Sequence, residues 1–235
     1  MSSYLKVSKD QLAQVQRKLN WQEKVLLCGN NRRTKQIEEF LDKPRTARNK
    51  YYELTESYES RDVTFTKVYA DMTQLIEKDG QFLDPYLEIA EMAHEVGKDG
   101  LYQNILWRAY MTAVSLIANK AGKYPKSLPW AWYENRHIIR GLNDFALLQW
   151  EIGEARLALE IYRKLLASNL NDNIGARYSI LALQLGYGPE YEAEFLPKKG
   201  PVYGLEAVKL EKWFSDNAKN FTEEFADFEK HLNQG

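Results

Sequence analysis

Apolar residues recur along most of this chain at spacings of three and four, which is the period of an amphipathic α-helix. The pattern is clearest from Ile138 to Leu185, where Gly153 and the run 171–173 (Asn-Asp-Asn) separate three such segments. Glycine and asparagine are common where one helix ends and another begins. The pattern therefore predicts helices over 134–151, 154–168 and 173–186. Few segments alternate with a period of two, so the chain is expected to be all-α.

The same periodicity predicts further helices on either side. Before the 138–185 segment they cover 9–19, 21–27, 34–41, 46–59, a segment through Ile76 that either Asp62 or Thr64 can cap, 84–97 and 101–118, and after it 203–215 and 221–233. Pro44 is expected to break or start a helix, because proline lacks a backbone N–H. Asp84 followed by Pro85 is the preferred start of a helix, with the aspartate as N-cap. These signals divide the chain into a basic helical segment 1–45, a helical array 46–186 and a C-terminal helical pair 187–235.

A small set of residues in this array resembles the tetratricopeptide repeat (TPR). The residues that carry the resemblance are Leu142, Phe145, Ala146, Gly153, Ala158, Tyr162 and Leu165. A looser second copy runs through Tyr86, Ile89, Ala90, Gly97, Leu106 and Ala109. The resemblance implies a divergent TPR-like α-solenoid, an irregular right-handed array of antiparallel helix pairs. The loop 119–133 would interrupt its regular spacing.

The resemblance also implies where a partner would bind. In TPR proteins the first helices of successive pairs line a concave groove. Alignment on the two turn glycines places six residues there: Arg140, Asn143, Asp144, Arg177, Glu88 and Glu91. Arginine suits a peptide carboxylate, because its guanidinium offers a planar fork of donors. The face is mixed in sign, and a solvated groove without a ligand is an equally open interpretation.

The loop 119–133 holds four large aromatic residues, Tyr124, Trp130, Trp132 and Tyr133. Exposed aromatics often form the energetic centre of an interface. Packing of the loop against the helices explains them equally well, and we favour it. The sequence thus predicts a non-catalytic scaffold or adaptor that holds a protein or peptide partner.

Charge suggests an alternative. Residues 1–50 carry twelve Lys and Arg against five Asp and Glu, a net charge of +7, and the other 185 residues carry 20 against 28, a net charge of −8. Within the basic end, Arg32, Arg33 and Lys35 follow a glycine turn, as the phosphate contacts of a helix-turn-helix would. A nucleic-acid-associated regulator that uses residues 1–50 is therefore the second hypothesis. A solvated basic helix face is the commoner meaning of such a pattern.

Enzymatic chemistry has weaker support. Two Glu-x-x-His triplets, Glu91 with His94 and Glu134 with His137, have the spacing of metal ligands on helices. The chain has no glutamate between Glu95 and Glu134, where a di-iron bundle usually supplies one, so a coincidence of surface residues is favoured. Cys28 is the only cysteine, which excludes an internal disulfide. No cofactor is expected, and the absence of long apolar runs leads us to expect a cytoplasmic protein that does not enter the membrane.

Overall fold

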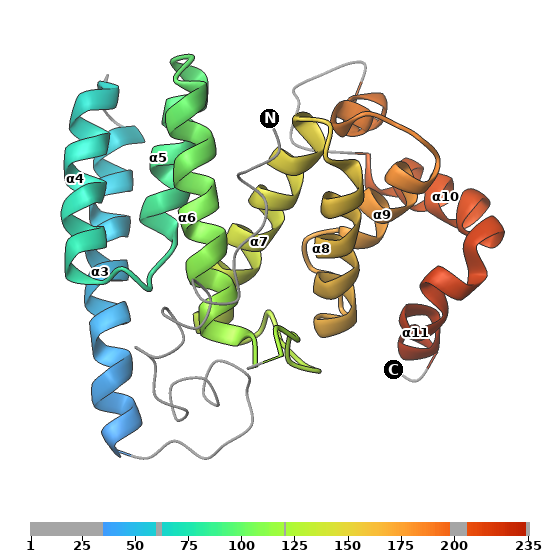
Figure 1. Ribbon diagram of the computed structural model, residues 1–235, viewed down its shortest axis with the longest axis horizontal. Helices are drawn as coiled ribbons and strands as arrows, with labels where there is room; N and C mark the ends of the chain where they lie inside the picture. Colours follow the sequence, from blue (N-terminus) through green and yellow to red (C-terminus); the bar gives the residue numbers. More distant parts are fainter. Residues whose placement is uncertain (1–34, 60–62, 120, 198–205, 234–235) are drawn as a thin grey trace. The chain divides into compact units, whose positions relative to one another are not determined.

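The computed structural model describes residues 35–59, 63–119, 121–197 and 206–233, with side chains described from residue 46 onward. This part of the chain is helical and contains no strand (Figure 1). The α-helices are α3 (Lys35–Glu59), α4 (Phe65–Lys78), α5 (Asp84–Glu95), α6 (Asp99–Ile117), α7 (Tyr133–Glu151), α8 (Ala155–Ser168), α9 (Ala176–Gln184), α10 (Ala207–Asn217) and α11 (Thr222–Leu232). Two 3₁₀ helices, η1 (Pro189–Phe195) and η2 (Ala218–Phe221), flank α10, and η1 lies where the sequence predicted no helix. The expectation of an all-α chain is confirmed for these residues.

Two predicted helix boundaries are wrong. Helix α3 continues through Pro44, where a break was expected. Proline removes one donor and displaces one carbonyl, yet it adopts helical dihedrals, so a long helix can continue on both sides of it. Helix α5 is preceded by Leu83 as its N-cap, and Asp84 lies inside the first turn. The Asp84 carboxylate instead forms an ion pair with Arg140.

The chain divides into two compact units, residues 1–145 and 146–235, and each is described by itself. In the first unit α3 packs against α4, α4 against α5, and α5 against α6 (Figure 1). Residues 133–145 of α7 belong to this unit. Its core contains Val68, Met72, Leu75, Phe82, Leu83, Ile89, Leu106, Ala109, Ile138, Leu142 and Phe145. Adjacent antiparallel helices thus bury one apolar stripe each, as their sequence period predicts.

In the second unit α8 packs against α9, and α10 and α11 pack against this pair. Phe214 of α10 lies edge-on to Phe225 and Phe228 of α11, with ring centroids 5.0 and 6.2 Å away. Trp213, on the neighbouring side of α10, lies close to Tyr191 and Phe195 of η1. Aromatic burial therefore holds the C-terminal helices in place.

Three helices end in the same way, at Gly97, Gly153 and Gly186. Each glycine has a positive φ, +70°, +85° and +78°. The residue after each glycine donates its N–H to a carbonyl five positions earlier, at 2.8, 2.7 and 2.9 Å. This is the Schellman arrangement, and the left-handed dihedral explains why glycine stands there. The predicted turn at Gly153 is confirmed.

None of the helices in the described residues combines the length and the apolar character needed to cross a membrane.

Candidate functional site

Five of the six predicted groove residues lie in the first unit, on α5 and α7. Glu88 and Glu91 share a stripe of α5 with Asp84, because residues at spacings of three and four lie on one side of a helix. Arg140, Asn143 and Asp144 share a stripe of α7 in the same way, together with Tyr133 and Arg136 at its start. The contact between Arg140 of α7 and Asp84 of α5 places the two stripes next to each other.

Helix α3 adds a third stripe. Tyr51 donates its hydroxyl to Glu88 of α5 at 3.0 Å. The hydroxyls of Tyr52 and Tyr133 of α7 are 3.2 Å apart. We define the three-helix face as the following residues: Arg48, Tyr51 and Tyr52 of α3; Asp84, Glu88 and Glu91 of α5; and Tyr133, Arg136, Arg140, Asn143 and Asp144 of α7.

An ion pair stands at the centre of the three-helix face. Arg140 donates from Nη2 to Oδ1 of Asp84 at 2.5 Å. The Asp84 side chain is 5% exposed and that of Arg140 is 39% exposed. Burial raises the pKa of Asp84, and the nearby Arg140 guanidinium opposes that rise. Asp84 balances the charge of Arg140 and accepts one of its donors. Fewer donors of the Arg140 guanidinium therefore remain for a peptide carboxylate than the sequence suggested.

One end of the face is acidic. Burial raises the pKa of Asp144 to about 6, and the charges of Glu91 and Asp84 add to this effect. Burial also raises the pKa of Glu88, again with a contribution from Glu91. Asn143 donates from Nδ2 to Asp144 at 3.1 Å, and this contact is local to α7. Burial is the main cause of both raised pKa values, and the neighbouring carboxylates add to it.

The other end is basic and aromatic. The guanidinium carbon of Arg48 lies 4.3 Å from the centre of the Tyr133 ring, and that of Arg136 lies 4.7 Å from it. Arg136 also donates from Nε to the carbonyl of Trp130 at 3.0 Å. Within the described residues, neither arginine forms an ion pair with a carboxylate. Two positive charges therefore share one exposed aromatic ring.

The aromatic loop packs against the first unit more than it projects from it. Tyr124 lies beside Tyr110, and burial raises the pKa of Tyr124 well above its usual value. Asn135, which is fully buried, donates to the carbonyl of Pro129 at 3.0 Å and so ties the loop to α7. Trp130 and Trp132 are partly buried, and Tyr133 is exposed. Of the four predicted loop residues, only Tyr133 belongs to the three-helix face.

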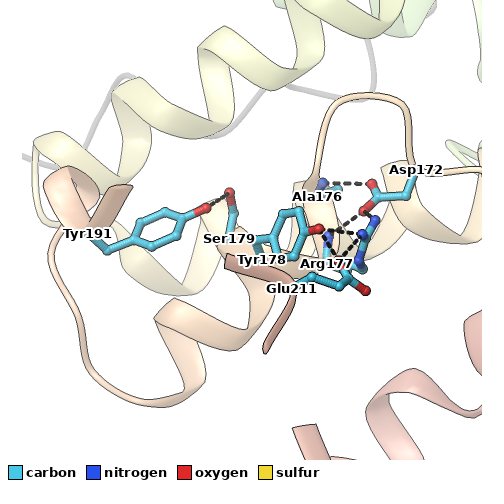
Figure 2. A network of polar contacts seen from close by, with 7 residues as sticks. All are labelled: Asp172, Ala176, Arg177, Tyr178, Ser179, Tyr191 and Glu211. Carbon is cyan, nitrogen blue, oxygen red and sulfur yellow. Dashed lines mark hydrogen bonds and ion pairs between the residues drawn. The ribbon is translucent and has the colours of Figure 1, made fainter. Parts of the chain in front are cut away.

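Arg177, the sixth predicted groove residue, lies in the second unit, where its side chain joins three helices. It donates to Asp172 at 2.9 Å and to Glu211 of α10 at 2.8 Å, and it also bonds the hydroxyl of Tyr178 (Figure 2). Its guanidinium lies 5.5 and 5.1 Å from the rings of Phe214 and Phe228. The Arg177 side chain is 15% exposed and that of Asp172 is 1% exposed. These contacts serve the packing of α9, α10 and α11.

Asp172 orients this network through an unusual backbone geometry. Its φ is +47°, which is uncommon for a residue other than glycine. In this conformation its carboxylate accepts the main-chain N–H groups of Ala176 at 2.7 Å and Arg177 at 3.2 Å (Figure 2). These groups open α9 and would otherwise lack partners, so Asp172 caps the helix from the preceding turn.

The two Glu-x-x-His triplets do not come together as a metal site in the part of the chain that the structure describes. The Nδ1 of His137 accepts the N–H of Leu83 at 3.2 Å, and burial lowers the pKa of His137 to about 3. His94 is exposed and lies 4.7 Å from the ring of Tyr102. Across the described residues, no group of three or more His, Cys, Asp and Glu side chains is arranged to hold a metal ion.

The nucleic-acid hypothesis depends on residues that mostly lie outside the described part of the chain. Arg32 and Arg33 are outside it, and Lys35 is described only as the first residue of α3. Among residues 46–50, whose side chains the structure describes, Arg48 interacts with an aromatic ring.

The contribution of α3 was missed in the sequence. No residue of α3 was among the predicted groove residues, whereas Tyr51 and Tyr52 direct their hydroxyls to Glu88 and Tyr133. The spacing of Arg48, Tyr51 and Tyr52 on one side of a helix was a usable signal, since polar groups on an aromatic stripe indicate a face that is not fully buried.

Comparisons with known proteins give no match: no family model, curated protein or solved structure is significantly similar to this chain.

Proposed function

We propose that this chain is a non-catalytic scaffold or adaptor that binds a protein or peptide partner on the three-helix face. The observation that carries the proposal is the convergence of three polar stripes, from α3, α5 and α7, on one side of the first unit. These contacts join the three helices, so the stripes are held together as one surface. Here the shared contacts hold Tyr51, Tyr52 and Arg140 in fixed positions.

Pre-positioned side chains favour binding, because their ordering cost is met during folding. The face also keeps groups that can contact a partner. Glu91 is exposed and forms no ion pair within the described residues, and Tyr52 and Tyr133 are exposed aromatics next to charged groups. Aromatic and arginine side chains are the residue types that contribute most to protein interfaces.

We further propose that the helix pairs form a divergent TPR-like solenoid. The apolar residues that carry the resemblance, including Leu142, Ala158 and Tyr162, are buried, as close helix pairing requires. In such an array, α5 and α7 are first helices of successive pairs, which agrees with their shared face. The solenoid is a proposal about the fold, and the binding proposal stands on the contacts of the face itself.

Affinity capture with the full chain tests the proposal. Proteins retained by the wild type would be compared by quantitative mass spectrometry with those retained by Glu91→Arg, which reverses one exposed charge on the face. Glu77→Arg, on the outer side of α4, is the matched control because Glu77 is also exposed. We expect a specific partner to fall at least fivefold with Glu91→Arg and to stay with Glu77→Arg. Equal retention by all three chains would contradict binding on this face.

A further inference from the structure

The three-helix face changes sign along its length. Arg48 and Arg136 form the basic end, where both guanidinium groups lie over Tyr133. The centre is neutral, because Arg140 and Asp84 form an ion pair. The acidic end comprises Glu88, Glu91 and Asp144, with Tyr51 and Asn143 as neutral donors.

The distance between the two ends follows from helix geometry. Arg136 and Asp144 are eight positions apart on α7, and an α-helix rises about 1.5 Å per residue, so the ends are about 12 Å apart. An extended peptide advances about 3.3 Å per residue, and about four residues span the same distance. A ligand with opposite charges at this separation would meet both ends at once.

We propose that the partner of this face is an extended peptide segment that carries one acidic and one basic residue about four positions apart. Its carboxylate lies between Arg48 and Arg136, and its basic side chain lies against Glu91 and Asp144. This inference rests on the proposed binding function and adds the chemistry of the partner.

Charge complementarity supports this occupant over partners of a single sign. Guanidinium groups without a carboxylate partner are strong donors to a planar carboxylate. A purely basic segment would place like charges against Arg48 and Arg136, and a nucleic-acid strand would place phosphates against Glu88, Glu91 and Asp144. Such juxtapositions disfavour a partner. A two-signed segment avoids both.

The test is selection of peptides from a displayed library of random twelve-residue sequences. The full chain would be used as wild type, Glu91→Arg, Arg48→Glu and the control Glu77→Arg. With the wild type and the control, we expect at least tenfold enrichment of peptides that carry an acidic and a basic residue three to five positions apart. With Glu91→Arg the enrichment of the basic position should fall at least threefold, and with Arg48→Glu the enrichment of the acidic position should fall by a similar factor.

Each outcome separates this inference from the binding function. Enriched peptides without the charge spacing, or with the same pattern on Glu91→Arg, would overturn the inference and leave peptide binding intact. No enrichment on any chain would count against the binding function itself. Sedimentation that shows a wild-type dimer lost in Glu91→Arg would assign the face to a second copy of this chain. Binding of a single-stranded DNA probe that Arg48→Glu abolishes would assign it to nucleic acid. Either result would overturn the two-signed peptide.

Discussion

Replacing Asp144 by Asn is expected to stabilise the protein at neutral pH. Asp144 lies at the acidic end of the three-helix face, and its pKa is raised from 3.8 to about 6 by burial and by the charges of Glu91 and Asp84. One pKa unit corresponds to about 1.4 kcal/mol, so this rise of about two units corresponds to at most about 3 kcal/mol. Since Asp144 is only partly buried and solvent screens its charge, we expect a gain of about 1–2 kcal/mol.

The sign of this effect depends on pH. A carboxyl group whose pKa is higher in the folded state holds its proton more tightly there. The stability that Asp144 contributes is fully present below about pH 4 and is lost as pH rises through about 6. Asparagine keeps the oxygen that accepts the Asn143 amide and carries no charge. The difference between Asp144→Asn and the wild type should therefore be small at pH 4 and reach its full value at pH 7.5.

Urea unfolding followed by circular dichroism at pH 4, 5, 6 and 7.5 measures this difference. The comparison is variant against wild type at each pH, because other groups, including His137 once the chain unfolds, bind protons in this range. Glu77→Gln, at an exposed site on α4, should change stability by less than about 0.5 kcal/mol at every pH. A variant that is no more stable than the wild type at pH 7.5, or whose advantage does not shrink toward pH 4, would contradict a raised pKa of Asp144 in the folded protein.

Three further predictions concern residues that hold the fold. Arg177→Lys should destabilise the second unit by about 2–4 kcal/mol in urea unfolding, because lysine lacks the planar guanidinium that binds both Asp172 and Glu211 of α10. An unchanged midpoint of unfolding would contradict this role. Gly153→Ala should lower the free energy of unfolding by about 1 kcal/mol, because alanine is strained at a φ of +85°. Gly100→Ala is the control: Gly100 lies near the start of α6 with open space around it, so this change should be neutral or stabilising. Equal effects of the two changes would contradict the role of Gly153 in the turn. NMR of the His137 ring should show it neutral from pH 7.5 down to about 4, and protonation near pH 6 would show that it is not buried against Leu83.

Local signals in the sequence explain most of the helix assignments. The turn at Gly153 could be predicted because a left-handed dihedral between two amphipathic segments requires glycine or asparagine. The continuation of α3 through Pro44 could not, because proline alone favours a helix boundary. The burial of Ala47, a tertiary contact, accompanies the helix on the C-terminal side of Pro44. At this position tertiary packing therefore outweighs the preference of proline for a helix boundary.

Some features of the candidate site could likewise be predicted from the sequence, and others could not. The stripes of Glu88 with Glu91 and of Arg140 with Asn143 follow from helical spacing and could be predicted. The pairing of Arg140 with Asp84 joins residues 56 positions apart, and only the fold determines it. The side chain of Arg177 likewise donates a hydrogen bond to Glu211, 34 positions away. Sequence periodicity thus indicates which residues share a face, whereas long-range pairing decides which of them remain available to a partner.

Site-directed photo-crosslinking tests binding on the three-helix face most directly. A benzoylphenylalanine residue would replace Asn143, between the ion pair and the acidic end, or Glu77 on the outer side of α4 as the control. After irradiation in an extract of the source cells, we expect a discrete higher-mass adduct from position 143 that is absent from position 77. No adduct at position 143, or the same adducts at both positions, would contradict the claim that this face binds a partner.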